Sequence, residues 1–208
     1  MSKFARPKTI LDANHMRLSQ KNPTTGKWAS LVWNATTSGK VKVTCWTGNE
    51  SDKAQVEFDL ITFNHMLQMV EKVVAGTEPG FIFTHEDYNY PGGRKTETRE
   101  LKGRFIMSRE DDKIYIAVIS PDTRVAIIKF FLALPETYRV VNKDKQPYSQ
   151  KDLSNLRCAA YFQTVSTILN QQALDTYQHK APDGGNGGGG ARSARPASGG
   201  NEFDDIAL

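Results

Sequence analysis

The stretch Ala29-Ser-Leu-Val-Trp-Asn-Ala-Thr-Thr-Ser-Gly-Lys-Val-Lys-Val-Thr-Cys-Trp-Thr47 sets the fold class of this chain. Apolar and polar residues alternate on both sides of the turn signal Thr37-Ser-Gly39. Alternation of this kind is typical of half-buried β-strands, and a short glycine-containing turn joins antiparallel neighbours. The sequence therefore predicts an antiparallel sheet that contains residues 29–36 and 40–47.

Outward from this hairpin, the pattern predicts two more strands and then a helix. The strands are expected at residues 16–21 and 55–60. Asp59 or Thr62 can cap the helix that follows, and Gly76 ends it. The apolar residues of the helix recur at helical spacing on one face, which comprises Phe63, Met66, Leu67, Val70 and Val74.

A second unit of the same design follows. Strands are expected at residues 81–84, 101–108, 113–120 and 124–133, before a helix that starts at the capping-box pair Ser149 and Asp152. The apolar face of this helix is marked by Cys158, Phe162, Val165 and Leu169. The predicted fold is α+β, with antiparallel sheets, two helices and a duplicated four-strand-plus-helix unit spanning residues 14–76 and 80–180. This element order resembles that of the Whirly and Pur-alpha groups of single-stranded nucleic-acid binders; the alternative is an elaborated OB barrel.

Composition points to one compact body, because 38% of the 208 residues are hydrophobic. No apolar run approaches the length that a membrane span needs, and the first residues lack the apolar core of a signal peptide. We therefore expect a cytoplasmic protein that has no membrane partner. Cys45 and Cys158 both lie among apolar residues and are expected to be buried, unreactive thiols.

The chain is expected to carry extensions at both ends of its body, residues 14–180. Residues 1–13 are predicted to be a flexible basic arm, with Lys3, Phe4, Arg6 and Lys8. Residues 181–200 hold eight of the sixteen glycines and no large apolar side chain, so a disordered linker is predicted. Residues 1–180 carry 25 basic and 19 acidic residues, which suits a body that binds a polyanion.

The last eight residues, Asn201-Glu-Phe-Asp-Asp-Ile-Ala-Leu208, place apolar side chains among carboxylates. A glycine linker with such a tip resembles the tail of bacterial and phage single-stranded DNA-binding proteins, although Ala207 and Leu208 stand where the bacterial form has proline and phenylalanine. The resemblance implies a tip that binds an apolar pocket ringed by cations on a protein partner. The residues expected to make this contact are Phe203, Asp204, Asp205, Ile206 and Leu208.

Candidate DNA-binding residues lie on strand faces, because single strands are held by cations along the phosphates and by aromatic faces under the bases. In residues 40–47, Lys40, Lys42 and Trp46 share the face opposite the apolar one, so Trp46 is predicted to stack on bases. Trp33 is predicted to be core. Trp28 and its neighbour Lys27 are further candidates at the end of a turn, with the role of Trp28 left open.

In the second unit, Lys102 and Arg104 are predicted to form another basic sheet face. The connection over residues 84–100 is longer than most hairpin loops and is predicted either to close over a bound strand or to be disordered. Its candidate contact residues are Tyr88, Tyr90, Arg94, Lys95 and Arg99. The carboxylates Glu86, Asp87, Glu97 and Glu100 oppose that role.

The sequence argues against an enzyme. Its histidines, His15, His65, His85 and His179, are far apart and lack metal-ligand spacing except in the run His85-Glu86-Asp87, which alone is weak evidence for a metal site. The glycine run at residues 184–190 lacks the context of a phosphate-binding loop. We therefore predict no catalytic residue, no metal and no cofactor.

The whole chain resembles the small single-stranded DNA-binding proteins of podoviruses that serve as cofactors of a phage RNA polymerase. The resemblance implies binding of single-stranded DNA without sequence preference, in the cytoplasm of a bacterial host. It also implies recruitment of a phage RNA polymerase or of replication proteins through the C-terminal tip. A homo-oligomer is expected. The alternative is an RNA-binding regulatory or adaptor protein.

Overall fold

A computed structural model describes residues 11, 16–49, 52–121, 127–135 and 138–177. The chain divides into two units, Met1–Gln178 and His179–Leu208. The predicted linker and tip, like most of the predicted arm, lie outside the described residues. Leu11, the one described residue of the arm, is buried in the core.

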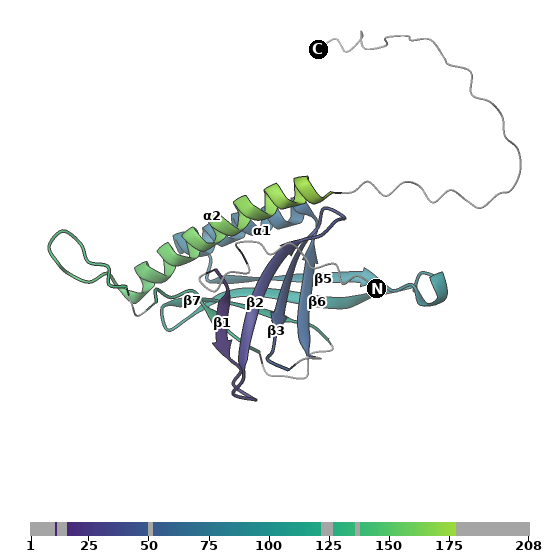
Figure 1. Ribbon diagram of the computed structural model, residues 1–208, viewed down its shortest axis with the longest axis horizontal. Helices are drawn as coiled ribbons and strands as arrows, with labels where there is room; N and C mark the ends of the chain where they lie inside the picture. Colours follow the sequence, from purple (N-terminus) through teal and green to yellow (C-terminus); the bar gives the residue numbers. More distant parts are fainter. Residues whose placement is uncertain (1–10, 12–15, 50–51, 122–126, 136–137, 178–208) are drawn as a thin grey trace, which may run out of the picture. The chain divides into compact units, whose positions relative to one another are not determined.

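Residues Met1–Gln178 contain two antiparallel sheets. In the first sheet, β1 (Leu18–Lys21), β2 (Trp28–Ala35), β3 (Val41–Trp46) and β4 (Lys53–Phe58) lie in sequence order. In the second, β5 (Gly80–Tyr88), β6 (Arg99–Glu110), β7 (Lys113–Ile119) and β8 (Phe130–Phe131) do the same. Each sheet is followed in the chain by one helix, as predicted (Figure 1).

Both helices begin as the sequence predicts, and the first also ends at the predicted glycine. In α1 (Leu60–Ala75), a carboxylate oxygen of Asp59 accepts from the Thr62 amide at 2.8 Å, and Gly76 follows with a left-handed φ of 78°. In α2 (Gln150–Thr176), the Ser149 hydroxyl accepts from the Asp152 amide at 3.1 Å. No helix within the described ranges is both long enough and apolar enough to cross a membrane.

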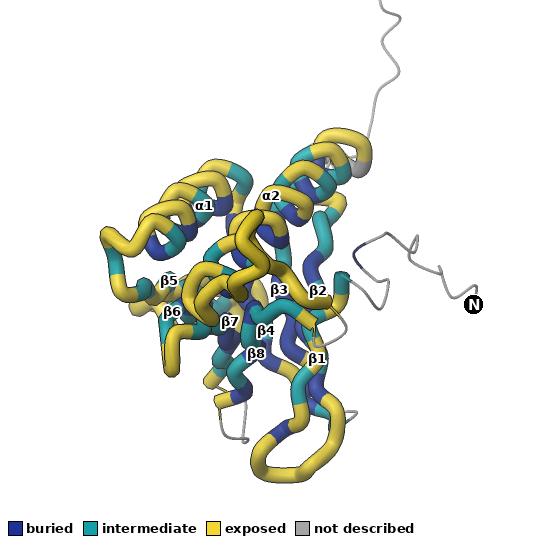
Figure 2. Tube along the Cα trace, turned by 90° about the vertical axis from the view of Figure 1, so that its left-hand side faces the viewer, coloured by how far each residue is buried: buried dark blue, intermediate teal, exposed yellow. Residues whose placement is uncertain are grey.

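The core lies between the inner faces of the two sheets and beneath the helices. The strands of the two sheets cross in Figure 1, and the buried residues of both helices face the strands in Figure 2. Trp33 of β2 is 2% exposed, and its ring lies 6.0 Å from that of Phe63 and 5.7 Å from that of Phe105. One indole thus joins the first sheet, α1 and the second sheet, which confirms the predicted core role of Trp33.

The crossing point of the sheets requires a glycine. A Cβ added to Gly103 of β6 would lie 2.4 Å from the Gln55 carbonyl oxygen of β4 and 2.9 Å from a methyl carbon of Val56. Only a residue without a side chain allows the two backbones to approach so closely.

Two predicted strand ranges are wrong in extent. The strand expected at residues 124–133 is reduced to Phe130–Phe131, with residues 122–126 outside the described ranges. Next to β8, the buried hydroxyl of Ser154 accepts from the Ile114 amide and donates to the Leu132 carbonyl, both at 2.8 Å. The hydroxyl thus bridges an amide and a carbonyl that would otherwise bond directly to each other.

The predicted loop over residues 84–100 is shorter than expected, because β5 continues to Tyr88 and β6 starts at Arg99, which leaves residues 89–98 as the connection. This part of the hairpin extends beyond the core. Both of its faces can therefore carry polar residues, because the backbone hydrogen bonds between β5 and β6 hold it together. Alternation of apolar residues therefore could not reveal it.

Candidate nucleic-acid interface

The outward side of the first sheet, which we call the first-sheet face, brings two tryptophans and three lysines together. The strand registers align Ser30, Trp46 and Lys53 in one row across β2, β3 and β4, and Asn34, Lys42 and Glu57 in another. Lys21 pairs with Trp28 across β1 and β2. The side chains in β2, β3 and β4 alternate with buried ones that face the core.

Both tryptophans of this face are open to solvent. Trp46 is 40% exposed and Trp28 is 67% exposed. The Lys53 ammonium lies 5.5 Å from the Trp46 ring centroid, and the Lys21 ammonium lies 5.9 Å from that of Trp28. Each ammonium lies over its ring, so a base that stacks on that face of the indole displaces the lysine, which can then pair with a phosphate.

A groove lies on this face between Trp46 and Lys42. Its volume is about 260 Å³, and it is lined by Val32, Asn34, Lys42, Thr44, Trp46, Lys53 and Gln55. The lining combines one aromatic surface with cations, hydroxyl and amide groups. Such a lining can contact base faces, base edges and phosphates together.

Lys42 is not a free cation, because its ammonium lies 2.6 Å from a Glu57 carboxylate oxygen. A phosphate would have to compete with that carboxylate. Glu57 lies in β4, and the pairing of β3 with β4 puts the two side chains opposite each other. The sequence prediction identified Lys42 but not its partner.

Lys40 does not line this groove, and its contact with DNA stays a prediction. Lys40 lies just before β3, in a turn where its amide donates to the Thr36 hydroxyl at 3.1 Å. It lines a second cleft, also of about 260 Å³, in the company of Glu57, Asp59 and Glu86. These carboxylates repel phosphate, so Lys40 does not extend the groove of the first-sheet face.

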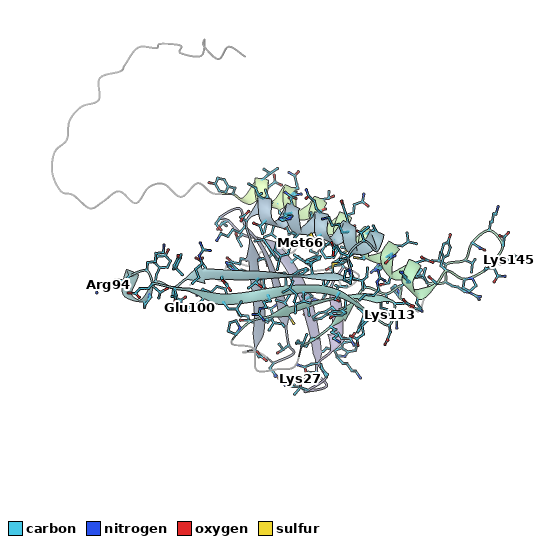
Figure 3. The ribbon with its side chains drawn as sticks, turned by 180° about the vertical axis from the view of Figure 1, so that it is seen from behind. Lys27, Met66, Arg94, Glu100, Lys113 and Lys145 are labelled. Carbon is cyan, nitrogen blue, oxygen red and sulfur yellow. The ribbon has the colours of Figure 1, made fainter. Side chains whose placement is uncertain are left out.

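Lys27 lies in the turn before β2, where its ammonium donates to the Asn49 side-chain oxygen at 3.1 Å (Figure 3). The residue is exposed and adjoins Trp28. It therefore lies at the tryptophan end of the first-sheet face.

The β5–β6 hairpin carries the other aromatic candidates, and only one of them is free to stack. The Tyr88 ring has the Lys95 ammonium 3.8 Å from its centroid and the Arg99 guanidinium carbon at 5.4 Å. Tyr90 is 60% exposed. Arg94, which is also exposed, lies at the hairpin tip in Figure 3. A base could reach Tyr90 directly but would have to displace cations from Tyr88.

The predicted basic face of Lys102 and Arg104 does not form as one surface. The register of β5 with β6 shifts between His85 and Glu86, and Lys102 has no partner in it. Its ammonium is hydrogen-bonded to Asn89 and lies 3.9 Å from a Glu100 oxygen. Arg104 is exposed on the outward side of the second sheet. The irregularity separates two residues that simple alternation placed together.

The buried titratable groups Cys45, Cys158 and Tyr161 belong to the hydrophobic core. Both cysteines are buried, as predicted, and burial raises the pKa of the Cys45 and Cys158 thiols to about 12. Burial also raises the pKa of Tyr161, whose hydroxyl accepts from the Trp33 indole at 3.1 Å. In the part of the chain that the structure describes, no group of three or more potential metal ligands occurs.

Two cations of the first-sheet face were missed by the sequence interpretation. Lys53 begins β4, two residues before the predicted start of that strand, and Lys21 ends β1. Strict alternation extended backward from Ala54 and Val56 would have placed Lys53 on the outward side.

Comparison with protein-family models, with curated proteins and with solved structures finds no match to this chain.

Proposed function

We propose that this chain binds single-stranded DNA without reading its sequence. The observation that carries the proposal is the first-sheet face, where exposed Trp28 and Trp46 each have a lysine ammonium over the ring and where Trp46 lines a polar groove. Stacking on an indole does not discriminate strongly among bases, since every base has a π-face.

A single strand suits this face better than a duplex. A duplex presents its phosphates and groove edges, whereas its base faces are covered by neighbouring bases. An open sheet with two exposed indoles can engage the bases of an unpaired strand directly, and contacts to them would be lost on a duplex.

The binding is expected to be moderate and sensitive to salt. Lys21 and Lys53 flank the indoles, but Lys42 is shared with Glu57 at 2.6 Å. Each phosphate neutralised on a single strand lowers the slope of log affinity against log salt by roughly 0.7. With two to three lysines at the face, we expect a slope of roughly −1.4 to −2.1 from this surface alone.

The order of four strands and a helix, twice, supports a likeness to the Whirly and Pur-alpha groups over the OB barrel. Two separate four-stranded sheets are hard to reconcile with one five-stranded barrel. We extend the proposal to a phage protein that acts in transcription, replication or recombination and recruits a polymerase or replication protein. The residues proposed for that recruitment are those of the C-terminal tip.

Fluorescence anisotropy with one labelled oligonucleotide tests the DNA-binding proposal. The same sequence is presented unpaired, as a duplex and as RNA, at a single salt concentration, and the unpaired DNA is then titrated over a salt series. We expect the unpaired DNA to bind much more tightly than the duplex, with weakening as salt rises. Equal affinity for unpaired DNA and duplex contradicts the proposal, and tighter binding of RNA favours the RNA-binding alternative.

A further inference from the structure

Two clefts of opposite charge meet at one ion pair of the first sheet. Lys42 lines the groove of the first-sheet face, whereas Glu57 lines the second cleft. The register of β3 with β4 places these two residues opposite each other, and the Lys42 ammonium lies 2.6 Å from a Glu57 carboxylate oxygen. The pair therefore stands on the boundary between the groove and the second cleft.

The second cleft, which we call the acidic cleft, does not continue the path of a nucleic-acid strand. Its lining includes the carboxylates of Glu57, Asp59 and Glu86, beside Lys40 and His85. Three carboxylates outnumber the single ammonium, so a phosphate that entered this cleft would meet charges of its own sign at short range.

The groove on the other side of the pair has the opposite character. Its lining holds Trp46 and two cations, Lys42 and Lys53, and none of the described residues that line it carries a carboxylate. Trp46 and Lys42 lie four residues apart on β3, which corresponds to roughly 14 Å along the strand. A strand that stacks on Trp46 and follows the groove thus reaches Lys42 after that distance, where Glu57 neutralises the cation.

We infer that Glu57 ends the strand path and limits the number of phosphates that the first-sheet face neutralises. This inference rests on the proposed function of that face. A phosphate can take Lys42 only by leaving the Glu57 carboxylate unpaired beside it. The two side chains are 24% and 32% exposed, so solvent screens the resulting repulsion only in part. An unfavourable contact of this kind restricts binding as effectively as a favourable one directs it.

The salt dependence of binding carries the consequence. Lys21 and Lys53 can each move from an indole to a phosphate, whereas Lys42 stays with Glu57. Each phosphate neutralised on a single strand contributes roughly −0.7 to the slope of log affinity against log salt, so this surface should give the wild type a slope of about −1.4. Removal of the Glu57 charge releases a third cation and should bring the slope to about −2.1.

Anisotropy titrations of the full chain with an unpaired oligonucleotide over a salt series test the inference. Glu57→Gln keeps the length of the side chain, should steepen the slope by roughly 0.7 and should raise the affinity roughly fivefold at 0.1 M salt. Glu71→Gln is the matched control. It removes the same charge from an exposed residue of α1, a helix that packs against the core side of the first sheet through Phe63 and Trp33. Equal slopes in the two variants would overturn the inference.

A double variant assigns the gained phosphate to Lys42. Glu57→Gln combined with Lys42→Gln should return the slope to the wild-type value, because the third cation is lost. A slope that stays steep in the double variant also overturns the inference. Failure of the proposed function gives a different result, namely equal affinity of the wild type for duplex and unpaired DNA. Preference for unpaired DNA without any effect specific to Glu57→Gln overturns the role of Glu57 alone.

Discussion

Trp33 and Trp46 lie on opposite sides of one sheet and have opposite consequences for the molecule. Trp33 is 2% exposed, contacts rings from α1, β6 and α2, and donates to the Tyr161 hydroxyl. Trp46 is 40% exposed and has a lysine beside it. Loss of the first ring should therefore cost stability, and loss of the second should cost binding.

Trp46→Ala is expected to weaken binding of single-stranded DNA by about 1–3 kcal/mol, the usual range for one stacking platform. The free energy of unfolding should change little, because the indole makes no core contact of the kind that Trp33 makes. Anisotropy titration with an unpaired oligonucleotide and denaturant unfolding measure the two effects separately.

Tyr138→Ala is the matched control for Trp46→Ala, since Tyr138 is 68% exposed and lies outside the first sheet. It should leave both quantities unchanged. Trp33→Ala should lower the free energy of unfolding by roughly 3–5 kcal/mol. Equal DNA affinity in Trp46→Ala and Tyr138→Ala would show that the first-sheet face is not the binding surface.

Alternation along residues 40–47 was enough to predict the exposure of Trp46. It could not predict that Lys42 is paired with Glu57 or that Tyr88 is covered by Lys95. Those contacts depend on strand register and on hairpin geometry, which a pattern within one strand does not contain.

At the scale of elements, Ser154 joins α2 to the second sheet. Its buried hydroxyl serves the Ile114 amide and the Leu132 carbonyl at once. Ser154→Ala should lower the free energy of unfolding by about 1–3 kcal/mol, because two buried backbone groups lose their partner. Denaturant unfolding measures this change.

Ser166→Ala on the same helix is the control for Ser154→Ala. The Ser166 hydroxyl is exposed and donates to the Gln163 carbonyl of its own turn at 3.0 Å. Its loss should change the free energy of unfolding by less than about 0.5 kcal/mol. Equal effects of the two substitutions would mean that the Ser154 bonds do not stabilise the fold.

The Asp59 cap makes part of the stability of α1 depend on pH. The hydrogen bond from the Thr62 amide, and then that from its hydroxyl, lower the pKa of Asp59 from its ordinary value of 3.8. The stabilisation is therefore present above pH 3.8 and is lost as the pH falls through the lower pKa of the folded state. Asp59→Ala should cost about 1 kcal/mol at pH 7.

Asp59→Asn keeps a capping side chain but does not titrate, so it isolates the pH effect. Unfolding free energies of wild type and Asp59→Asn, measured from pH 7 to pH 2.5, should converge or cross as the wild type loses its cap. Parallel curves over that range would contradict the linkage.

The helix caps were predictable from sequence because they are local, whereas the length of β8 and the β5–β6 hairpin were not. Ser154 lies twenty-two residues from Leu132 in the chain, so its effect on the strand end is tertiary. The hairpin extends beyond the core. Neither of its faces is buried there, so its sequence does not alternate between apolar and polar residues.

At the scale of the whole molecule, the two sheets present different faces. The first combines indoles with lysines, and the outward side of the second combines Ile82, Ile106 and Ile119 with Arg104 and Glu110. The sequence predicted two sheets, but not that β6 crosses β4 at Gly103. This close approach turns the inner faces of the two sheets toward each other and leaves their outward faces to contact other molecules.

The last prediction concerns the charge of the whole chain. Residues 181–208 contain four acidic and two basic residues, so their removal raises the formal net charge from +4 to +6. Deletion of residues 182–208 should therefore leave DNA affinity unchanged or slightly raised, most clearly at low salt, where long-range repulsion is least screened. The deletion also removes Phe203, Ile206 and Leu208, so recruitment of the protein partner should be lost.

Ile206→Ala with Leu208→Ala separates the two effects of that deletion. The double variant keeps every charge of the tail, so its DNA affinity should match the wild type at each salt concentration. Its capture of a purified candidate polymerase should fall as far as that of the truncated protein, because an apolar pocket ringed by cations loses the side chains that fill it. Equal capture by full-length and truncated proteins would place recruitment in the body, and the acidic-hydrophobic tip would then act on DNA affinity through charge alone.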